Sequence, residues 1–364
     1  MGNKMTQLVI VVGTRPEIIK LAPVIKTLEQ KNINFTFIHT GQHYDYEMSK
    51  IFIEELGLPK PDISFILNNR NPAAQIGEIM IKLEKILEKN NFKIMIIQGD
   101  TNSMLASGLI ALKLGIRIGH VEAGLRSYDW RMPEEHNRRM IDHVSNYLFA
   151  PTELAKNNLL NEKVWGEVYV TGNTIIDAIN IYFNKINDEI LNLIKFTEYG
   201  LVTFHRSENV DDPYILRKFI QILEKSPIPL VFVVHPRTKK RLIEFNLWKK
   251  IKSIKHLQLL PPLGYFKFLA LMKNARIILT DSGGLQEEAT HPKIRKFVLI
   301  LRSSTERPEA IEAGFAKLVG IEPDAVLSNL KEKLNEDCPL PNTSPFGDGK
   351  AARRIVNILE RKLE

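Results

Sequence analysis

Short apolar runs alternate with segments of helical spacing along the whole chain. The run QLVIVV at 7–12 leads into a segment whose apolar residues recur at helical spacing from Ile18 to Leu28. The same order, a buried run followed by a helical pattern, returns at 93–114 and at 116–144. A strand followed by a helix, repeated many times, predicts an α/β fold with a parallel sheet covered by helices on both faces.

The alternation restarts in the second half of the chain. Five strand-like runs, separated by helical segments, lie at 199–204, 228–234, 256–260, 275–280 and 295–301. The pattern therefore predicts two α/β domains facing a cleft, where ligands meet the carboxyl ends of the strands. We expect domains at 1–172 and 197–349, a helical connection at 173–196, and a closing amphipathic helix at 350–364 that completes the first domain.

Polar side chains repeatedly follow the apolar run of a predicted strand. They are Arg15, His43, Asp100, Glu122, His205, His235, Asp281 and Ser282. Because the carboxyl ends of parallel strands share one edge of a sheet, these positions indicate chemistry at that edge.

Two segments combine a buried strand, a glycine-containing turn and a helix start. We call VVGTRPEIIK (11–20) the first cradle and LTDSGGLQEEA (279–289) the second cradle. Free amides at a helix start attract anions, and Arg15, Lys20 and Arg307 could add charge-assisted hydrogen bonds worth about 1.5–3 kcal/mol each. Glycine is also common in strand–helix turns, but one cradle in each half favours a nucleotide-diphosphate ligand.

The acids and histidines have structural alternatives. Asp100 could cap a helix, and Glu134 with Arg138, or Glu135 with Arg139, could form ordinary i,i+4 ion pairs. Glu122 continues a half-buried strand, where an unpaired carboxylate is costly. His205 and His235 could take up a proton near neutral pH or serve as satisfied interior histidines.

Composition narrows the class of protein. The chain has 364 residues, 44% of them hydrophobic and 25% charged, with a formal net charge of +8 and a single cysteine, Cys338. The positive charge suits phosphate ligands, but no basic block indicates nucleic-acid binding. No motif indicates a metal site, and no apolar run is long enough to span a membrane, so we expect a cytoplasmic protein.

Eleven segments, in order from residue 13 to about 320, together carry a resemblance. They are GTRPEIIKLAPV, TGQH, GDT, HVEAGLRS, PEEHNR, APTELA, VTGNTIIDA, HRSEN, HPR, TDSGGLQEEA and TERPEAIEAG. In this set the chain resembles the non-hydrolysing UDP-N-acetylglucosamine 2-epimerases.

The resemblance implies two Rossmann-like domains in the glycosyltransferase-B architecture, with substrate in the cleft. It implies interconversion of UDP-GlcNAc and UDP-ManNAc by elimination of UDP, through 2-acetamidoglucal, and re-addition. No cofactor is expected. The implied partners are these UDP-sugars and a second copy of the chain in a homodimer, with neither nucleic acid nor membrane.

The resemblance also assigns roles to residues. The implied catalytic set is Asp100, Glu122, Glu134 and His205. The implied UDP contacts are Arg15, Lys20, Phe268, Ser282, Gly283, Gly284, Glu288 and Arg307. The implied counterparts of an activator site for a second UDP-GlcNAc are Gln42, His43, Arg70, Arg206 and His235. Support or a solvated face is expected of Glu135, Arg139 and Asp142.

The sequence departs from the family pattern in places that bear on the activator site and on base contacts. Asp45 stands where a glutamine is usual, Ser207 where an arginine is usual, and segments 261–268 and 291–297 differ. Three rival functions remain open at this point: a glycosyltransferase that uses a UDP-sugar donor, a hydrolysing epimerase, and a non-catalytic UDP-sugar sensor.

Overall fold

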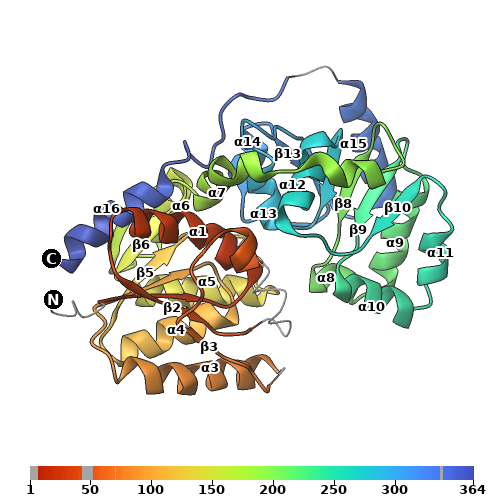
Figure 1. Cartoon of the computed structure of the whole chain (residues 1–364). Coiled ribbons are helices and arrows are strands. Elements are labelled where there is room, and N and C mark those ends of the chain that lie inside the picture. The colour runs from red at the N-terminus through yellow and green to blue at the C-terminus, as the bar shows by residue number, and fades with distance from the viewer. Residues whose placement is uncertain (1–6, 43–51, 70, 337–338) are drawn as a thin grey trace. The chain divides into compact units, whose positions relative to one another are not determined.

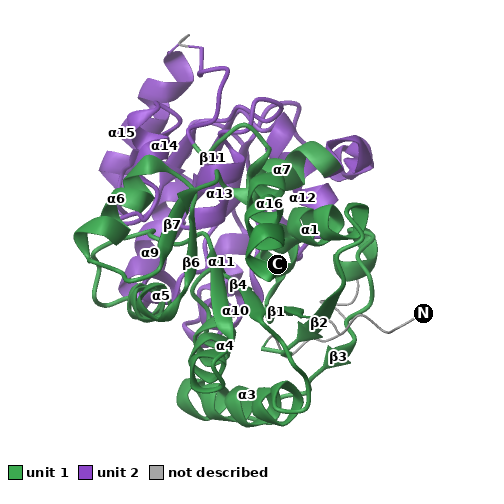
Figure 2. Ribbon diagram, turned by 90° about the vertical axis from the view of Figure 1, so that its left-hand side faces the viewer, with its two compact units in different colours: residues 1–181, 346–364 green, residues 182–345 purple. Residues whose placement is uncertain are grey.

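The computed structural model describes residues 7–42, 52–69, 71–336 and 339–364 (Figure 1). The chain divides into two compact units (Figure 2). Unit 1 comprises residues 1–181 and 346–364, and unit 2 comprises residues 182–345. Each unit is built on its own parallel sheet, as the alternating pattern predicts.

The sheet of unit 1 has the strand order β3-β2-β1-β4-β5-β6-β7, and each paired neighbour is parallel. Its strands are β1 (Leu8–Val12), β2 (Phe35–His39), β3 (Ile63–Ser64), β4 (Ile94–Gln98), β5 (Arg117–Val121), β6 (Tyr147–Ala150) and β7 (Glu167–Val170). Strands β1 and β4 are buried at every position, which fits central strands covered on both faces.

Helices connect the strands of unit 1 and cover its sheet. They are α1 (Arg15–Gln30), α3 (Pro72–Leu87), α4 (Asn102–Lys113), α5 (Pro133–Val144), α6 (Glu153–Asn161) and α7 (Thr174–Tyr182). The closing helix α16 (Ala351–Leu363) packs beside α1. Asp177 of α7 accepts hydrogen bonds from the first amides of α16, with 2.9 Å from the Ala352 nitrogen to Oδ1, so the start of the closing helix is fixed within unit 1.

The sheet of unit 2 has the strand order β10-β9-β8-β11-β12-β13. Its strands are β8 (Gly200–Thr203), β9 (Leu230–Val233), β10 (Leu257–Leu260), β11 (Ile277–Thr280), β12 (Val298–Ile300) and β13 (Ala316–Leu318). One apolar core lies against this sheet and includes Phe204 stacked on Phe219, with ring centroids 4.0 Å apart. The chain reverses its strand order at β8 and β11, which is where doubly wound sheets hold ligands.

Short helical turns and helices surround the second sheet. They are η1 (Phe183–Lys185), η2 (Asp188–Leu193), α8 (Ser207–Val210), α9 (Pro213–Glu224), α10 (Pro236–Glu244), α11 (Trp248–Lys252), α12 (Tyr265–Asn274), α13 (Gly283–Glu288), α14 (Pro308–Glu312) and α15 (Pro323–Asn335). Helix α9 buries one face that includes Leu216 and Phe219 and exposes the other, as its amphipathic sequence predicts.

Candidate active site

The candidate site in unit 1 is formed where polar residues follow the carboxyl ends of adjacent strands. Asp100 follows β4 and Glu122 follows β5, and these strands pair in parallel register up to Gln98 and Val121. In unit 2, His205 follows β8 and Asp281 follows β11, its neighbour. The sequence prediction that these side chains gather at the carboxyl edge of each sheet is confirmed, while His43 lies outside the described residues.

The Glu122 side chain is buried, and its carboxylate is fixed by an ion pair and a hydrogen bond. The Lys20 ammonium lies 2.5 Å from its Oε2, and the Gln98 amide donates to the same oxygen at 2.5 Å. The Glu122 backbone has φ 71°, the left-handed region that a side chain with a β-carbon adopts at a cost. Its amide donates to the Phe149 carbonyl of the next strand at 3.1 Å, which holds this conformation. Backbone strain around a buried ionised carboxylate is typical of functional sites.

A buried brace links the Glu122 loop to the Asp100 loop. The His120 ring contacts Oδ1 of Asp142 at 2.7 Å through Nδ1 and the Gly99 carbonyl at 2.9 Å through Nε2. Burial opposes ionisation of Asp142, but the hydrogen bond and charge of His120, together with the Arg126 guanidinium 2.8 Å away, hold its pKa below the usual value. Asp142 is therefore buried support, and the solvated-face alternative for it is wrong.

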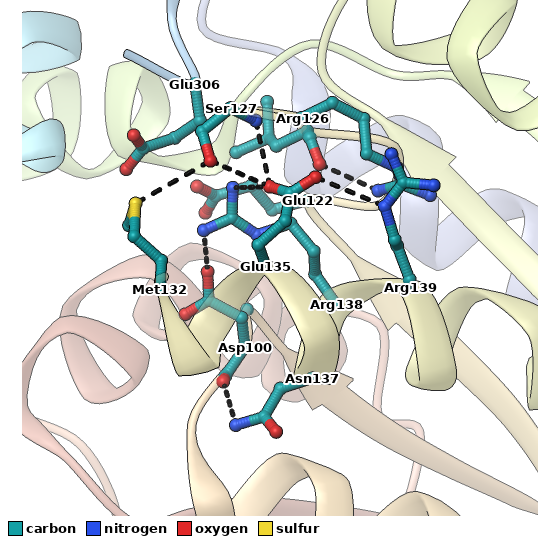
Figure 3. A network of polar contacts seen from close by, with 12 residues as sticks. Asp100, Glu122, Arg126, Ser127, Met132, Glu135, Asn137, Arg138, Arg139 and Glu306 are labelled. Atoms are coloured by element: carbon teal, nitrogen blue, oxygen red, sulfur yellow. Dashed lines mark hydrogen bonds and ion pairs between the residues drawn. The ribbon is translucent and has the colours of Figure 1, made fainter. Parts of the chain in front are cut away.

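Asp100 does not cap the following helix. Thr101 is the N-cap of α4, and its hydroxyl accepts from the Met104 amide at 3.4 Å. The Asp100 carboxylate instead pairs with Arg138 of α5 at 2.7 Å, and Asn137 donates to its carbonyl at 2.9 Å (Figure 3). The capping alternative is wrong, because the residue after Asp100 performs that role.

Helix α5 presents two adjacent glutamates with opposite environments. Glu135 is fully buried, and its carboxylate accepts from the amide and hydroxyl of Ser127, each at 2.9 Å (Figure 3). It also pairs with Arg138 at 3.3 Å and Arg139 at 3.2 Å. Glu134 is half-buried, and within the described part of the chain its side chain makes neither an ion pair nor a hydrogen bond.

Of the two i,i+4 ion pairs considered for α5, Glu134–Arg138 and Glu135–Arg139, the structure contains only the second among its described residues. The Glu135–Arg139 pair forms, whereas Arg138 pairs with Asp100 and Glu135, and Glu134 has no ion pair among the residues that the structure describes. Glu135 supports the site and does not belong to a solvated face.

The first cradle differs from its prediction in one respect. The amides of Gly13 and Thr14 are not free, because both donate to the carboxylate of Glu17, at 2.9 Å for Thr14. The Thr101 hydroxyl donates to the other Glu17 oxygen at 2.6 Å. Burial raises the pKa of Glu17 to about 7, although these hydrogen bonds oppose that shift. The turn thus holds an internal carboxylate, and sequence reasoning assigned no role to Glu17.

The predicted basic groups of the first cradle also have protein contacts. The Arg15 guanidinium lies 4.1 Å from the centroid of the Phe52 ring. Lys20 is buried and paired with Glu122. A buried ammonium beside a carboxylate keeps both groups charged.

The second cradle has the predicted strand, turn and helix, with Ser282 at the N-cap of α13. A β-carbon at Gly283 would lie 2.5 Å from Nη1 of Arg307, so glycine allows the guanidinium to approach the turn. Arg307 pairs with Glu287 at 2.8 Å and with Glu306. Four predicted UDP contacts, Phe268, Gly283, Glu288 and Arg307, are buried in unit 2, and Ser282 and Gly284 are half-buried.

Asp281 orients the imidazole of His205. In the sequence, Asp281 is among the polar residues that follow predicted strands, but the pattern gave it no role. Nδ1 of His205 lies 3.1 Å from Asp281, which also accepts from the amides of residues 205 and 206. Burial opposes ionisation of Asp281, but the charge and hydrogen bond of His205 lower its pKa to about 2. The result is an ionised aspartate beneath a part-exposed imidazole, an arrangement suited to proton transfer.

The predicted activator residues are only partly described. Gln42 caps α4 by accepting from the Ser103 amide at 2.8 Å, and Arg206 lies 3.4 Å from Glu306. His235 is the N-cap of α10, and its ring centroid lies 5.3 Å from that of His205. His43 and Arg70 lie outside the described residues, as does Asp45.

The described residues contain neither a metal-ion site nor a membrane-spanning helix. Among them no group of three or more His, Cys, Asp or Glu side chains is arranged to hold a metal ion. In the same residues no helix has both the length and the apolar character needed to cross a bilayer.

Comparison with known proteins gives the class. A family model described as UDP-N-acetylglucosamine 2-epimerase matches residues 26–360. The UDP-N-acetylglucosamine 2-epimerase of Methanocaldococcus jannaschii is 46% identical, over 97% of this chain and 98% of that protein. A crystal structure from the same organism, in complex with UDP-GlcNAc and UDP, has a TM-score of 0.90 at 46% identity, covering 97% of this chain and 99% of the other.

A third relative is named for a different UDP-sugar substrate. The UDP-2,3-diacetamido-2,3-dideoxy-D-glucuronate 2-epimerase of Pseudomonas aeruginosa is 34% identical, over 96% of this chain and 98% of that protein. The two parallel sheets have the α/β architecture of the glycosyltransferase-B class, as the structural match supports. The chain belongs to the UDP-N-acetylglucosamine 2-epimerase family, a family of isomerases.

Proposed function

We propose that the chain catalyses the reversible C2 epimerisation of UDP-GlcNAc to UDP-ManNAc. Family membership supports the reaction. The observation that carries it is the set of three carboxylates at the first candidate site, of which Glu134 is unpartnered among the described residues. Binding a UDP-sugar requires no such proton-handling set, whereas moving a proton at C2 does.

The proposed mechanism is elimination and re-addition. A base removes the C2 proton, the bond from C1 to the UDP oxygen breaks, and a C1–C2 double bond forms to give 2-acetamidoglucal and UDP. The UDP oxygen then adds to C1 while an acid protonates C2 from the opposite face. The C2 proton is not adjacent to a carbonyl, so departure of UDP is needed to make its removal feasible.

We assign proton transfer to Asp100, Glu122, Glu134 and His205. The carboxylates of Glu122 and Asp100 pair with Lys20 and Arg138, whereas Glu134 forms no ion pair within the described residues. Lys20 holds the charge of Glu122 in place, and Asp281 orients the imidazole of His205. Each correctly placed acid or base contributes roughly 10²–10⁴-fold to rate.

We assign the binding of UDP to residues of both cradles. Stabilisation of the departing diphosphate would come from cationic groups and the start of α13. The proposed contacts are Arg15, Lys20, Phe268, Ser282, Gly283, Gly284, Glu288 and Arg307.

Product analysis separates the proposal from its rivals. Incubation with UDP-GlcNAc, without cofactor or acceptor, should give UDP-ManNAc by proton NMR. A hydrolysing epimerase would release free ManNAc and UDP, and a transferase would require an acceptor. The diacetamido glucuronate substrate of the Pseudomonas relative is the control UDP-sugar, and faster turnover of that compound would reassign the substrate.

Isotope scrambling tests the elimination step. UDP-GlcNAc labelled with ¹⁸O in the bridge between C1 and the β-phosphorus should lose the label to non-bridging positions in recovered substrate. Epimerisation without any scrambling would contradict release of UDP.

We further propose that Gln42, His43, Arg70, Arg206 and His235 bind a second UDP-GlcNAc as activator. His235→Ala should then weaken the dependence of rate on UDP-GlcNAc, and an unchanged dependence would remove the site. We also propose that the chain forms a homodimer, is cytoplasmic and has the domain limits 1–172 and 197–349.

A further inference from the structure

Four cationic side chains line a cavity of about 430 Å³ in unit 2. Arg276 directly precedes β11, Arg295 and Lys296 precede β12, and Lys333 lies near the end of α15. Since β8, β11 and β12 are neighbouring parallel strands, their amino ends meet at one edge. That edge is opposite the carboxyl edge that carries His205, so the cavity is separate from the candidate site of this unit.

Two of the four cations have carboxylate partners in the cavity wall. Arg276 lies 3.4 Å from Glu198, and Lys333 lies 2.8 Å from Glu336. The Lys333 ammonium also lies 4.3 Å from the centroid of the Phe297 ring. These pairs leave the charge of the other two cations uncompensated.

The side chains of Lys296 and Arg295 have no anionic partner among the described residues. Within the described part of the chain, the Lys296 ammonium makes neither a hydrogen bond nor an ion pair. The Nη2 group of Arg295 donates to the Leu340 carbonyl, but its Nε is buried and donates to nothing. Burial, together with the nearby charge of Arg276, lowers the pKa of Lys296. An unpaired cation under these conditions is costly unless an anion enters.

The geometry points to a binding site for a phosphate monoester dianion in this cavity. Two uncompensated cations match the charge of about −2 that a phosphate monoester carries near neutral pH. A guanidinium with an unused N–H and an ammonium are the donors that phosphate oxygens accept most strongly. A cavity of 430 Å³ falls in the range of small-molecule sites, so it has room for an organic group beyond the phosphate.

Calorimetric titration of the full chain, saturated with UDP and in phosphate-free buffer, tests the site. UDP occupies the proposed substrate site, so heat from a second ligand reports a different one. Inorganic phosphate and glucose 6-phosphate are the probes, and their relative affinities distinguish free phosphate from a phosphorylated metabolite. We expect saturable one-to-one binding of at least one probe.

Charge-removing variants connect that binding to the cavity. Lys296→Met and Arg276→Gln should each weaken it about tenfold or more. Because the Arg276 side chain is exposed, we expect Arg276→Gln to fold even if Lys296→Met does not. Lys252→Gln removes an exposed charge of unit 2 that does not line the cavity, and its affinity should equal that of the wild type. Absence of saturable binding up to about 10 mM, or equal affinity in folded Arg276→Gln and wild type, would overturn the inference.

Discussion

The ammonium nitrogen of Lys20 lies 2.5 Å from a carboxylate oxygen of Glu122, and both side chains are buried. One residue comes from helix α1 and the other from the end of β5, 102 positions apart. A buried pair of this kind recovers its desolvation cost only with good geometry and additional hydrogen bonds, here from Gln98. The pair keeps an ionised carboxylate in a strained position, so we base the first prediction on it.

Glu122→Gln should lower kcat by at least about 100-fold while affinity for the UDP-sugar changes much less. The amide keeps the shape of the side chain but cannot exchange protons as a carboxylate does. Steady-state kinetics and UDP titration measure the two quantities, and Glu153→Gln, an exposed glutamate of α6, is the matched control. A variant that retains more than about a tenth of the wild-type rate would remove Glu122 from the mechanism.

The adjacent glutamates of α5 should respond in opposite ways. Glu134→Gln should lose turnover with an unchanged Tm, because within the described residues its side chain forms neither an ion pair nor a hydrogen bond. Glu135→Gln should lower the free energy of unfolding by about 3–5 kcal/mol, because it removes a fully buried carboxylate that pairs with two arginines. Thermal unfolding and kcat, measured on both variants, check this. Equal destabilisation of the two would contradict the assignment.

Asp281→Asn should reduce turnover and stability together. The depressed pKa, about 2 in place of 3.8, means that ionised Asp281 stabilises the fold above pH 3.8. This contribution of about 2 kcal/mol is lost as pH falls from 3.8 towards 2. Urea unfolding near neutral pH should therefore separate variant from wild type by about that amount. A shifted pH profile of kcat would indicate that His205 has lost its orienting partner, and an unchanged profile would assign Asp281 a purely structural role.

Glu17→Gln should remove a pH dependence of stability. The pKa of Glu17 is raised from 4.5 to about 7, so the folded state retains a proton that the unfolded state loses. The free energy of unfolding of the wild type should fall as pH rises from 4.5 to 7, by up to about 3 kcal/mol. Chemical denaturation at about pH 5 and about pH 8 should show the variant gaining relative to wild type. The exposed Glu29→Gln on the same helix is the control, and a variant that tracks the wild type at both pH values would refute the effect.

The sequence was informative where a long apolar run ends in an unusual polar residue. Strands β4 and β5 are five buried or nearly buried residues each, so their ends, and thus Asp100 and Glu122, could be located. The short strands β3, β6 and β13 were not anticipated, because two to four residues carry little periodicity.

Partners of the site residues could not be predicted in the same way. Asp281 contacts His205 because β8 and β11 are neighbouring strands. The local sequence pattern does not predict which strands pair when the residues concerned lie 76 positions apart. Glu17 looks like an ordinary first-turn acid, and only the fold brings the Thr101 hydroxyl to it. Glu134 likewise has no ion pair within the described residues because Arg138 pairs with Asp100 instead.

Proton NMR of the purified chain with UDP-GlcNAc in D₂O tests the central claim most directly. The account predicts UDP-ManNAc carrying deuterium at C2, together with slow appearance of deuterium in the remaining UDP-GlcNAc. The Glu153→Gln control should behave in the same way, and Glu122→Gln should incorporate almost none. Formation of UDP-ManNAc with the original proton retained at C2 would contradict the proposed exchange of that proton, and no change in either UDP-sugar would contradict the epimerase reaction itself.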